Sequence, residues 1–305
     1  MPDFPKLRGR AILAPMAGYT DIAFRVLCDR YGASLTFTEF VSSAAVVVGH
    51  LNENILSRKG LKLAGVQIFG SDVDEIVEAS KILEKTFDII DLNCGCPEKE
   101  VTKIGAGSDL LKHPDKLFSI VKDMVDNVNV PITVKIRSGY GKKINALEIA
   151  KLVEKAGAVA LTLHARTKEQ NYGTVANWQL IKQVKESISI PVIGNGDIFS
   201  AEDFAQKLKS SQVDYVSIGR GALGNPAVFD DIKQFLEAGK YISESRPKMF
   251  MEYLKLAKKY KVSYNHIKSH AMYFTKGLEN AAKIRLKIGK CEDSESITAI
   301  FRDFL

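Results

Sequence analysis

The sequence contains little cysteine and no long apolar run. Four cysteines among 305 residues are too few for a disulfide scaffold, which indicates a reducing environment. No apolar stretch approaches the roughly 20 residues that a membrane-spanning helix needs. Residues 1–6 contain no apolar core of the kind that a secretory signal has. We therefore expect a cytoplasmic protein that does not span a membrane.

Most of the chain also lacks an excess of charge of either sign. Residues 1–239 contain 29 Lys and Arg and 29 Asp and Glu, whereas residues 240–305 contain 14 basic and 7 acidic side chains. The whole net charge of +7 therefore lies in the last fifth of the chain. A neutral body with a basic extension favours a polyanionic partner such as a nucleic acid. Lysine-rich helices that are simply well solvated would have the same composition.

The sequence does contain a regular alternation of short apolar runs and amphipathic segments. Eight runs, several of them almost wholly apolar like buried parallel strands, predict strands at 11–15, 35–41, 63–69, 87–92, 131–137, 159–164, 190–194 and 215–219. Helical periodicity lies between them at 72–85, 114–127, 145–156, 177–186 and 200–208. Eight such units over about 235 residues predict an α/β fold, a (β/α)8 TIM barrel.

The pattern changes after residue 239, where no further strands are expected. Residues 249–261 and 263–278 are predicted helices, and 294–301 is a candidate third. We therefore expect a barrel domain over residues 1–238 and a small C-terminal helical domain over residues 239–305. An open doubly wound sheet is the alternative for the first part, but the dinucleotide fingerprint that usually follows its first strand is missing.

The most informative motif is Asn93-Cys94-Gly95-Cys96-Pro97, directly after the apolar run at 87–92. Its glycine and proline make the chain turn, so a thiol is presented on a sharp loop at the carboxyl end of a strand. An unperturbed thiol is mostly protonated at neutral pH, and Cys96 could donate a proton to a carbanion. Two thiolates would need two more ligands to hold a metal, and no second closely spaced pair exists, so no metal is expected.

Cationic side chains stand at the ends of two other predicted strands. Lys135 and Arg137 share one face of the strand at 131–137 because residues two apart point the same way. His164 and Arg166 repeat this arrangement one strand later. Cations at the mouth of a barrel could stabilise an anionic cofactor or intermediate, although a surface strand end could carry them without a function.

Small-residue turns follow the first strand and the last two. Ala14-Pro15-Met16-Ala17-Gly18 would let the backbone approach a flat ligand, or would form an ordinary turn. Gly194-Asn195-Gly196-Asp197 and Gly219-Arg220-Gly221 offer free backbone N–H groups where barrels usually bind phosphate. Gln67 could bind the same ligand or make a hydrogen bond in the core. These turns predict a phosphorylated cofactor across the barrel mouth.

With these motifs the sequence resembles the dihydrouridine synthases, flavin enzymes that reduce uridine in tRNA. The likeness spans nearly the whole chain, and its motifs are jointly specific. It is carried by segments 14–21, 38–42, 66–70, 93–97, 164–167, 194–197 and 219–226, by Lys135, Gln170, Tyr172 and Trp178, and in the tail by His270, Tyr273, Lys276-Gly277 and Arg285. Cys94 departs from the family, which more often has an apolar residue there, whereas Cys96 occupies the family's cysteine position.

The resemblance implies an FMN-bearing barrel and a helical tRNA-binding domain, with NADPH as electron source and a monomer as the expected state. Hydride from reduced FMN would add to C6 of uracil, and Cys96 would protonate C5. The residues implied for the cofactor are Ala14, Pro15, Met16, Gln67, Lys135, His164, Arg166, Asn195, Gly196, Asp197, Gly219 and Arg220. Those implied for the substrate are Asn93, Arg137, Gln170, Tyr172 and Arg285.

Three other functions would use parts of the same pattern. An FMN oxidoreductase of a free pyrimidine or small enone, similar to a dihydroorotate dehydrogenase, would leave the basic tail without a role. An RNA-binding protein with the barrel as a scaffold would not need Cys96, Lys135, His164 and Arg166 together. A sugar-phosphate isomerase would need a carboxylate base, and none stands out.

Overall fold

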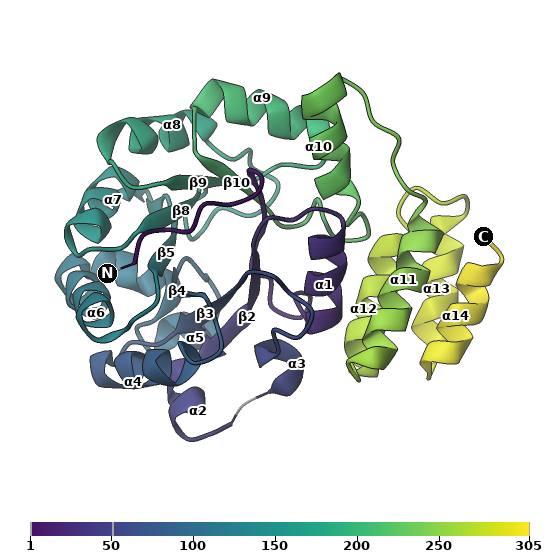
Figure 1. The fold of residues 1–305 in the computed structure, drawn as a ribbon, viewed down its shortest axis with the longest axis horizontal. Helices are drawn as coiled ribbons and strands as arrows, with labels where there is room; N and C mark the ends of the chain where they lie inside the picture. Colours follow the sequence, from purple (N-terminus) through teal and green to yellow (C-terminus); the bar gives the residue numbers. More distant parts are fainter. Residues whose placement is uncertain (1, 51, 305) are drawn as a thin grey trace.

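The chain folds around a closed barrel of parallel strands (Figure 1). The computed structural model describes residues 2–50 and 52–304. The eight barrel strands within these residues are β1 (Ala11–Leu13), β2 (Thr36–Ser42), β3 (Ala64–Phe69), β4 (Ile89–Cys94), β5 (Ile132–Arg137), β8 (Ala160–His164), β9 (Val192–Asn195) and β10 (Tyr215–Ile218). They neighbour one another in chain order, and β10 closes the ring by pairing with β1. The predicted (β/α)8 TIM barrel is therefore confirmed.

The two sides of the barrel wall differ in composition because successive residues of a strand point to opposite sides. On β5, Val134 and Ile136 are buried in the core that the surrounding helices share, whereas Thr133 and Lys135 face the interior. The interior is apolar toward the amino ends of the strands, where a separate cluster contains Ile12, Leu35, Phe37, Ile89, Ala160 and Ile193. Polar residues can therefore gather only at the carboxyl ends, above this apolar layer.

Helices surround the barrel and connect its strands. The longer ones are α1 (Ile22–Arg30), α4 (Val73–Leu83), α6 (Pro114–Asn127), α7 (Ala146–Lys155), α8 (Trp178–Ser187), α9 (Ala201–Ser211) and α10 (Val228–Ala238). Side-chain caps begin several of them, as at Asp72, which accepts from Glu75 N, and Ser200, which accepts from Asp203 N. The five helical segments predicted between the strands correspond to α4, α6, α7, α8 and α9.

Short elements decorate the carboxyl-terminal side of the barrel strands. They are α2 (Ser43–Val47), α3 (Glu53–Leu56), α5 (Lys99–Lys103), the 3-10 helix η1 (Gly107–Lys112) and the hairpin β6 (Gly139–Tyr140) to β7 (Lys143–Ile144). The hairpin strands β6 and β7 lie outside the barrel. The barrel neighbour of β5 is therefore β8, the next barrel strand along the chain.

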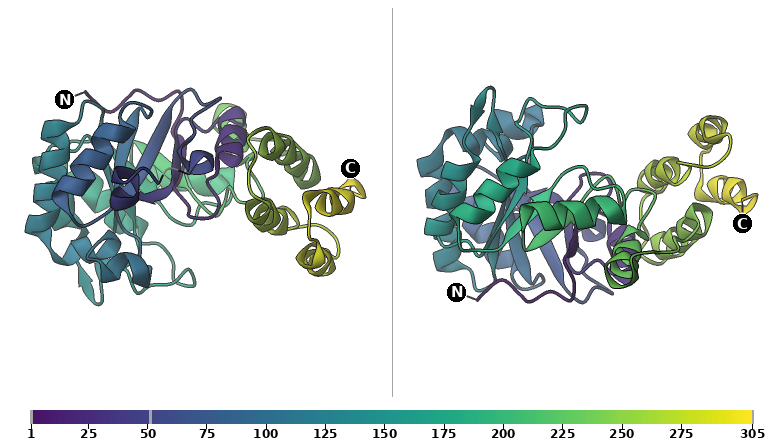
Figure 2. Two further views of the ribbon diagram at one scale, coloured as in Figure 1. Left: turned by 90° about the horizontal axis from the view of Figure 1, so that it is seen from below. Right: turned by 90° about the horizontal axis from the view of Figure 1, so that it is seen from above.

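The last part of the chain is a group of helices beside α1 and α10 (Figure 2). Within residues 240–304 they are α11 (Arg246–Lys259), α12 (Tyr264–Phe274), α13 (Ala281–Lys290) and α14 (Ser294–Arg302), and no strand is present. Three match the predicted helical segments, but the sequence did not predict α13. Its buried apolar residues are Ile284 and Ile288 in an otherwise basic segment, and only packing against its neighbours makes that helix evident.

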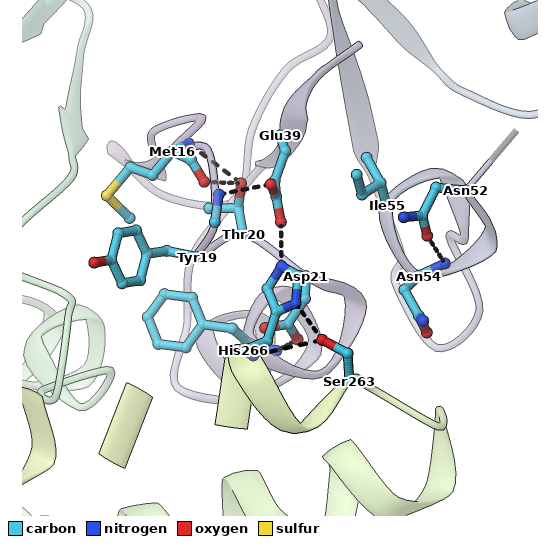
Figure 3. Close-up of polar contacts among 12 residues, drawn as sticks. Met16, Tyr19, Thr20, Asp21, Glu39, Asn52, Asn54, Ile55, Ser263 and His266 are labelled. Carbon is cyan, nitrogen blue, oxygen red and sulfur yellow. Dashed lines mark hydrogen bonds and ion pairs between the residues drawn. The ribbon is translucent and has the colours of Figure 1, made fainter. Parts of the chain in front are cut away.

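Paired polar groups join these helices to the barrel (Figure 3). Glu39 of β2 accepts from Gly18 N at 2.6 Å and lies 3.2 Å from Nε2 of His266 on α12. Asp21, the cap of α1, accepts from the hydroxyl of Tyr253 at 3.0 Å and lies 3.3 Å from Nε2 of His270. Both acidic residues belong to the barrel and both histidines to α12, so these contacts attach the helices to β2 and to the start of α1.

Candidate active site

The carboxyl ends of the barrel strands open into a cavity of about 670 Å³. This size is typical of small-molecule sites, which range over roughly 300–1,000 Å³. Every residue predicted to bind the cofactor lines it, as do Cys96, Asn93, Arg137, Gln170 and Tyr172. Arg285 is the exception, because it lies exposed on α13 outside this cavity. The structure thus gathers residues from all parts of the barrel sequence at one mouth.

The Cys96 loop leaves β4 as a tight turn held by side chains. Asn93 Oδ1 accepts from the backbone N–H groups of Gly95 (3.1 Å) and Cys96 (2.8 Å). Arg137 Nε donates to Gly95 O at 2.9 Å. The side chain of Cys96 is 8% exposed and faces the cavity, whereas that of Cys94 is buried in the outer core. Only one of the two cysteines can therefore meet a ligand.

The thiol of Cys96 is arranged to stay protonated. Burial raises the pKa of Cys96, and this effect prevails over the hydrogen bond from Glu98 N and over the charges of Lys135 and Arg137. The proton is therefore present at neutral pH, and the two nearby cations can stabilise the thiolate that remains once the proton has left. This is the condition that a thiol acid requires.

Among residues 2–50 and 52–304, the ammonium group of Lys135 has neither an ion-pair partner nor a hydrogen-bond acceptor, whereas Arg137 at least donates to carbonyl oxygens. Burial and the neighbouring Arg137 lower the pKa of Lys135 to about 8, while Asp91 acts in the opposite direction. Its ammonium group is therefore charged at neutral pH, but the protein compensates little of the free energy that burying this charge costs. A negatively charged ligand would relieve this cost.

Arg137 is more strongly bound by the protein than its predicted role in substrate binding implies. Besides its bond to Gly95 O, its guanidinium donates to the carbonyl oxygens of Thr167 (2.7 Å) and Gln170 (3.3 Å). Gln170 in turn accepts from Thr167 N through Oε1 at 2.8 Å. Arg137 therefore braces the Cys96 loop against the loop after β8 while keeping its charge at the mouth.

His164, Arg166 and Asp197 form one connected group. Arg166 donates to both oxygens of Asp197 at 2.7 Å and to His164 Nε2 at 3.0 Å. Because arginine only donates, Nε2 of His164 must be the acceptor and Nδ1 must carry the ring proton. Burial and the surrounding cations lower the pKa of His164 to about 2. His164 is therefore a neutral hydrogen-bond donor at the mouth.

Asp197 organises two arginines of the mouth. Arg220 also reaches Asp197 Oδ1, at 3.2 Å. Burial raises the pKa of Asp197, but hydrogen bonds from Arg166 and Ala176 N outweigh it and keep the pKa below its usual value. A carboxylate engaged in this way holds Arg166 and Arg220 in place for an anion. Asp197 can therefore serve an anionic cofactor by positioning these arginines.

Tyr172 covers the arginines on the solvent side. Its side chain is 58% exposed, and the guanidinium carbon of Arg220 lies 3.8 Å from its ring centre. The ring also stacks on His164, with the two ring centres 6.3 Å apart. Such cation–π contacts are weak at exposed positions, about 0.5–1 kcal/mol. Tyr172 can therefore move aside for a ligand at small cost.

Two further residues of the mouth were not predicted from the sequence. Asp91 lies on β4 two residues before Asn93 and accepts hydrogen bonds from Gln67 and Thr133. Its position as a charged residue within an apolar run was a signal that could have identified it. Tyr273 of α12 lines the same cavity, so the helical region borders the site. No local pattern in the sequence indicates this second contact.

Neither a metal centre nor a membrane-spanning helix is found in the described part of the chain. Among residues 2–50 and 52–304, no group of three or more His, Cys, Asp and Glu side chains is placed to hold a metal ion. In the same part of the chain, no helix has the length and apolar character needed to cross a bilayer.

The sequence is similar to a family model and to several characterised proteins. Residues 12–304 match the model of the family described as dihydrouridine synthase. The chain is 40% identical over 287 residues to tRNA-dihydrouridine synthase B of Pasteurella multocida (strain Pm70), covering 92% of this chain and 83% of that protein. It is 41% identical over 243 residues to tRNA-dihydrouridine synthase B of Escherichia coli (strain K12), covering 78% of this chain and 75% of that protein.

Solved structures share the barrel at much lower sequence identity. The old yellow enzyme homologue of Zymomonas mobilis matches 77% of this chain and 89% of its own, with a TM-score of 0.52 and 13% identity. A structure titled as a complex of 2-naphthoyl-CoA reductase matches 77% of this chain and 50% of its own, with a TM-score of 0.59 and 12% identity. At this level of identity the likeness concerns the fold alone.

Proposed function

The chain belongs to the dihydrouridine synthase family, and we propose that it reduces uridine to 5,6-dihydrouridine in tRNA with FMN as cofactor and NADPH as reductant. The observation that carries this proposal is a buried, protonated thiol beside unpaired Lys135 in a cavity that α12 also borders. One cavity thus combines an acid, Cys96, with a cation, Lys135, and it is bordered by the basic helical region, to which a large polyanion could bind.

The residues of the cavity fit FMN. The backbone N–H groups of Arg220 and Gly221 meet no acceptor within residues 2–50 and 52–304, as a phosphate site requires. Gly221 must lack a side chain, because a Cβ there would lie 2.0 Å from Ile198 O. This turn, together with Arg166, would hold the phosphate, and Met16 would lie against the flat ring. Lys135 and the remaining N–H of Gln67 would bind the polar edge of the ring.

The chemistry divides between cofactor and protein. Reduced FMN would supply the hydride that C6 of uracil accepts. Cys96 then gives its proton to C5, which completes the addition of two hydrogens across the C5=C6 bond. The thiolate left behind lies near Lys135 and Arg137, whose charges stabilise it until solvent returns a proton. One N–H of Asn93 is free for a uracil carbonyl, since its other groups are engaged.

The two parts of the chain divide the work. Residues 1–238 form the catalytic domain, and residues 239–305 bind the tRNA backbone through their excess of basic side chains. Arg285 is exposed and lies outside the cavity, so it contacts the RNA away from the reacting base. The uridine must leave its stack to enter the cavity, as in other enzymes that modify bases. The protein acts as a monomer in the cytoplasm.

An anaerobic single-turnover experiment tests this function. The flavin of the purified protein is reduced with NADPH, excess reductant is removed, and unmodified tRNA transcript is added. We expect flavin reoxidation together with a mass gain of two hydrogens on one uridine. A protein without flavin would contradict the proposal, and flavin that remains reduced with both transcript and fully modified cellular tRNA lacking dihydrouridine would indicate a small-molecule substrate.

A further inference from the structure

A continuous chain of hydrogen bonds crosses the barrel interior from β5 to the Cys96 loop. Thr133 Oγ1 donates to Asp91 Oδ1 at 2.6 Å, and Gln67 Nε2 donates to Asp91 Oδ2 at 2.7 Å. Asn93 Nδ2 donates to Gln67 Oε1 at 2.8 Å. Asn93 Oδ1 then accepts from Cys96 N at 2.8 Å. Asp91 is thus linked through two amides to the backbone that carries the thiol.

The direction of this chain is determined from both ends. A carboxylate only accepts, so Gln67 must turn its NH2 group toward Asp91 and its oxygen toward Asn93. The backbone N–H groups of Gly95 and Cys96 only donate, so Asn93 must turn its oxygen toward them. The two requirements agree in the middle, where the NH2 of Asn93 meets the oxygen of Gln67. Neither amide has a second orientation that satisfies its neighbours.

The carboxylate of Asp91 is buried, which is energetically unfavourable for a charged group. Its side chain is 2% exposed, and burial raises the pKa of Asp91 to about 6. The hydrogen bonds from Thr133 and Gln67 and the charge of Lys135 lower this pKa again. Lys135 on β5 and Cys94 on β4 are the titratable groups coupled to it. An apolar residue would avoid the cost of burial but would leave the NH2 of Gln67 without an acceptor.

We propose that Asp91 is a positioning residue, whose carboxylate orients the amides of Gln67 and Asn93 and thereby holds the Cys96 backbone in place. The thiol is then kept where it can give its proton to the substrate. The role of this positioning in proton transfer rests on the proposed function, whereas the positioning of the Cys96 loop by Asp91 does not. Nothing else in the proposed chemistry requires a carboxylate at this depth.

Two isosteric substitutions test the direction of the chain. In Asp91→Asn, the new NH2 can donate to Thr133, whose hydroxyl can turn to accept, so Gln67 keeps its acceptor. In Thr133→Val, Asp91 still accepts from Gln67. In the double variant the new NH2 has no acceptor at position 133. The chain then contains one donor more than it has acceptors, whichever way the amides turn.

The first measurement is the rate of Cys96 alkylation by N-ethylmaleimide, followed by peptide mass spectrometry and divided by the rate for Cys291. Cys291 lies between α13 and α14, away from the cavity, and serves as an internal reference. We expect each single variant to change this ratio by about twofold at most. The double variant should raise it about tenfold, as expected for a lost hydrogen bond worth on the order of 1.4 kcal/mol.

The second measurement needs only single variants and the wild type. Dividing the Cys96 rate by the Cys291 rate removes the general dependence of thiol alkylation on pH. In the wild type and in Asp91→Asn the ratio should change at most about twofold with pH, because the Thr133 hydroxyl can turn to accept from protonated Asp91 as it does from the new amide. In Thr133→Val we expect the ratio to rise as the pH falls, because protonated Asp91 then has a donor without an acceptor at position 133. This rise should begin somewhat above pH 6, because the substitution removes a hydrogen bond that lowers the pKa of Asp91.

A matched control and a functional assay complete the design. Thr36→Val removes a buried hydroxyl on β2 that has no hydrogen-bond partner within residues 2–50 and 52–304, so it should leave the alkylation ratio unchanged. In tRNA reduction, the double variant should lower kcat about tenfold with little change in KM. The proposal would be overturned by an alkylation ratio that changes neither in the double variant nor with pH in Thr133→Val, even if the wild type reduces tRNA. Loss of tRNA reduction in the wild type would instead contradict the proposed function and leave the alkylation result to decide the role of Asp91.

Discussion

The barrel mouth and the surface between the barrel and α12 treat buried charge in opposite ways. At the mouth, cations outnumber carboxylates: the cavity is lined by Lys135, Arg137, Arg166, Lys168 and Arg220 and by Glu98, Glu169 and Asp197, and Asp91 is buried near Lys135. At the surface between the two parts, Glu39 and Asp21 each have a histidine partner on α12. The surface that joins the parts is therefore balanced, whereas the mouth has an excess of positive charge.

This difference distinguishes a ligand-binding site from a fixed contact between two parts of the chain. We call the fixed contact, formed by Asp21, Glu39, Tyr253, His266 and His270, the joint. Unbalanced buried charge destabilises a protein unless a ligand of opposite sign enters. Paired charge contributes to attachment without a ligand. The imbalance at the mouth is thus a physical mark of an anion-binding site, and the balance at the joint is the mark of a fixed contact. Substitutions in the two regions should have opposite effects on the stability of the protein without its ligands.

The largest effect should come from the acid at the mouth. Cys96→Ala should lower tRNA reduction by a factor of about 10²–10⁴, the usual contribution of general acid catalysis, because no other thiol faces the cavity. Flavin content and NADPH oxidation should stay near the wild-type level. Cys94→Ala is the matched control, since that thiol is buried in the outer core, and it should retain activity. Equal losses in both variants would remove the acid role from Cys96.

The joint should be most sensitive at Asp21. Burial raises the pKa of Asp21, but hydrogen bonds from His270 and Tyr253 prevail and lower it. Asp21→Ala leaves the hydroxyl of Tyr253 without its acceptor and removes the cap of α1, whereas His270 Nε2 keeps Tyr19 O at 2.9 Å. The substitution should cost about 2–3 kcal/mol of unfolding free energy. Chemical denaturation measures this loss. Because the pKa of Asp21 is lowered, its contribution is present above its ordinary pKa and declines as the pH falls below it. A stability unchanged by the substitution would contradict the description of the joint.

Lys135 should show the opposite sign. Lys135→Met removes an unpaired, half-buried cation, so the protein without cofactor should melt at a higher temperature than the wild type. The same variant should bind flavin more weakly, by about tenfold, because the ligand loses its counter-charge. In the wild type, flavin affinity should decline as the pH rises through about 8, where the ammonium loses its proton. A variant that melts at a lower temperature than the wild type and binds flavin with normal affinity would contradict the description of Lys135 as an uncompensated cation of a ligand site.

The smallest effect should be the pH dependence of the joint. The hydrogen bond to Glu39 raises the pKa of His266. The ion pair therefore stabilises the fold fully below the ordinary histidine pKa, and its contribution is lost as the pH rises through the raised value. A partly exposed pair of this kind is worth about 0.2–1 kcal/mol. The difference in unfolding free energy between wild type and His266→Gln, measured from pH 5 to 9, should show this decline. A constant difference would indicate that the pair contributes no charge effect.

The barrel could be predicted from the sequence because its signals are local. Each strand is a short apolar run, and each main helix has an apolar stripe, so eight repeats of the pair indicate the closed fold. Helix α13 lacked such a signal because Ile284 and Ile288 are its only buried apolar residues, and both depend on α12 and α14 for burial. Long-range packing, which no local pattern records, produces this helix.

The same distinction applies to the site. Residue types and strand ends were enough to indicate Cys96, Lys135 and the glycine turns as parts of one mouth. The partners of these residues were not predictable, because Gln67 comes from β3 and Asp91 and Asn93 from β4, and they meet only when these two strands pair. Tyr273 reaches the cavity from a helix more than two hundred residues away from Met16.

The sequence by itself determined the barrel, the basic character of the last helices and which side chains carry the chemistry. Periodicity, glycine turns and residue type are properties of neighbouring residues and are visible without a structure. The tertiary structure alone decided the state of these groups. Burial keeps the proton on Cys96, the arginines hold Asp197 as an ionised partner, and hydrogen bonds between strands set the direction of two amides. Each of these depends on which groups approach in space, because solvation and hydrogen bonding act through distance and not through order along the chain.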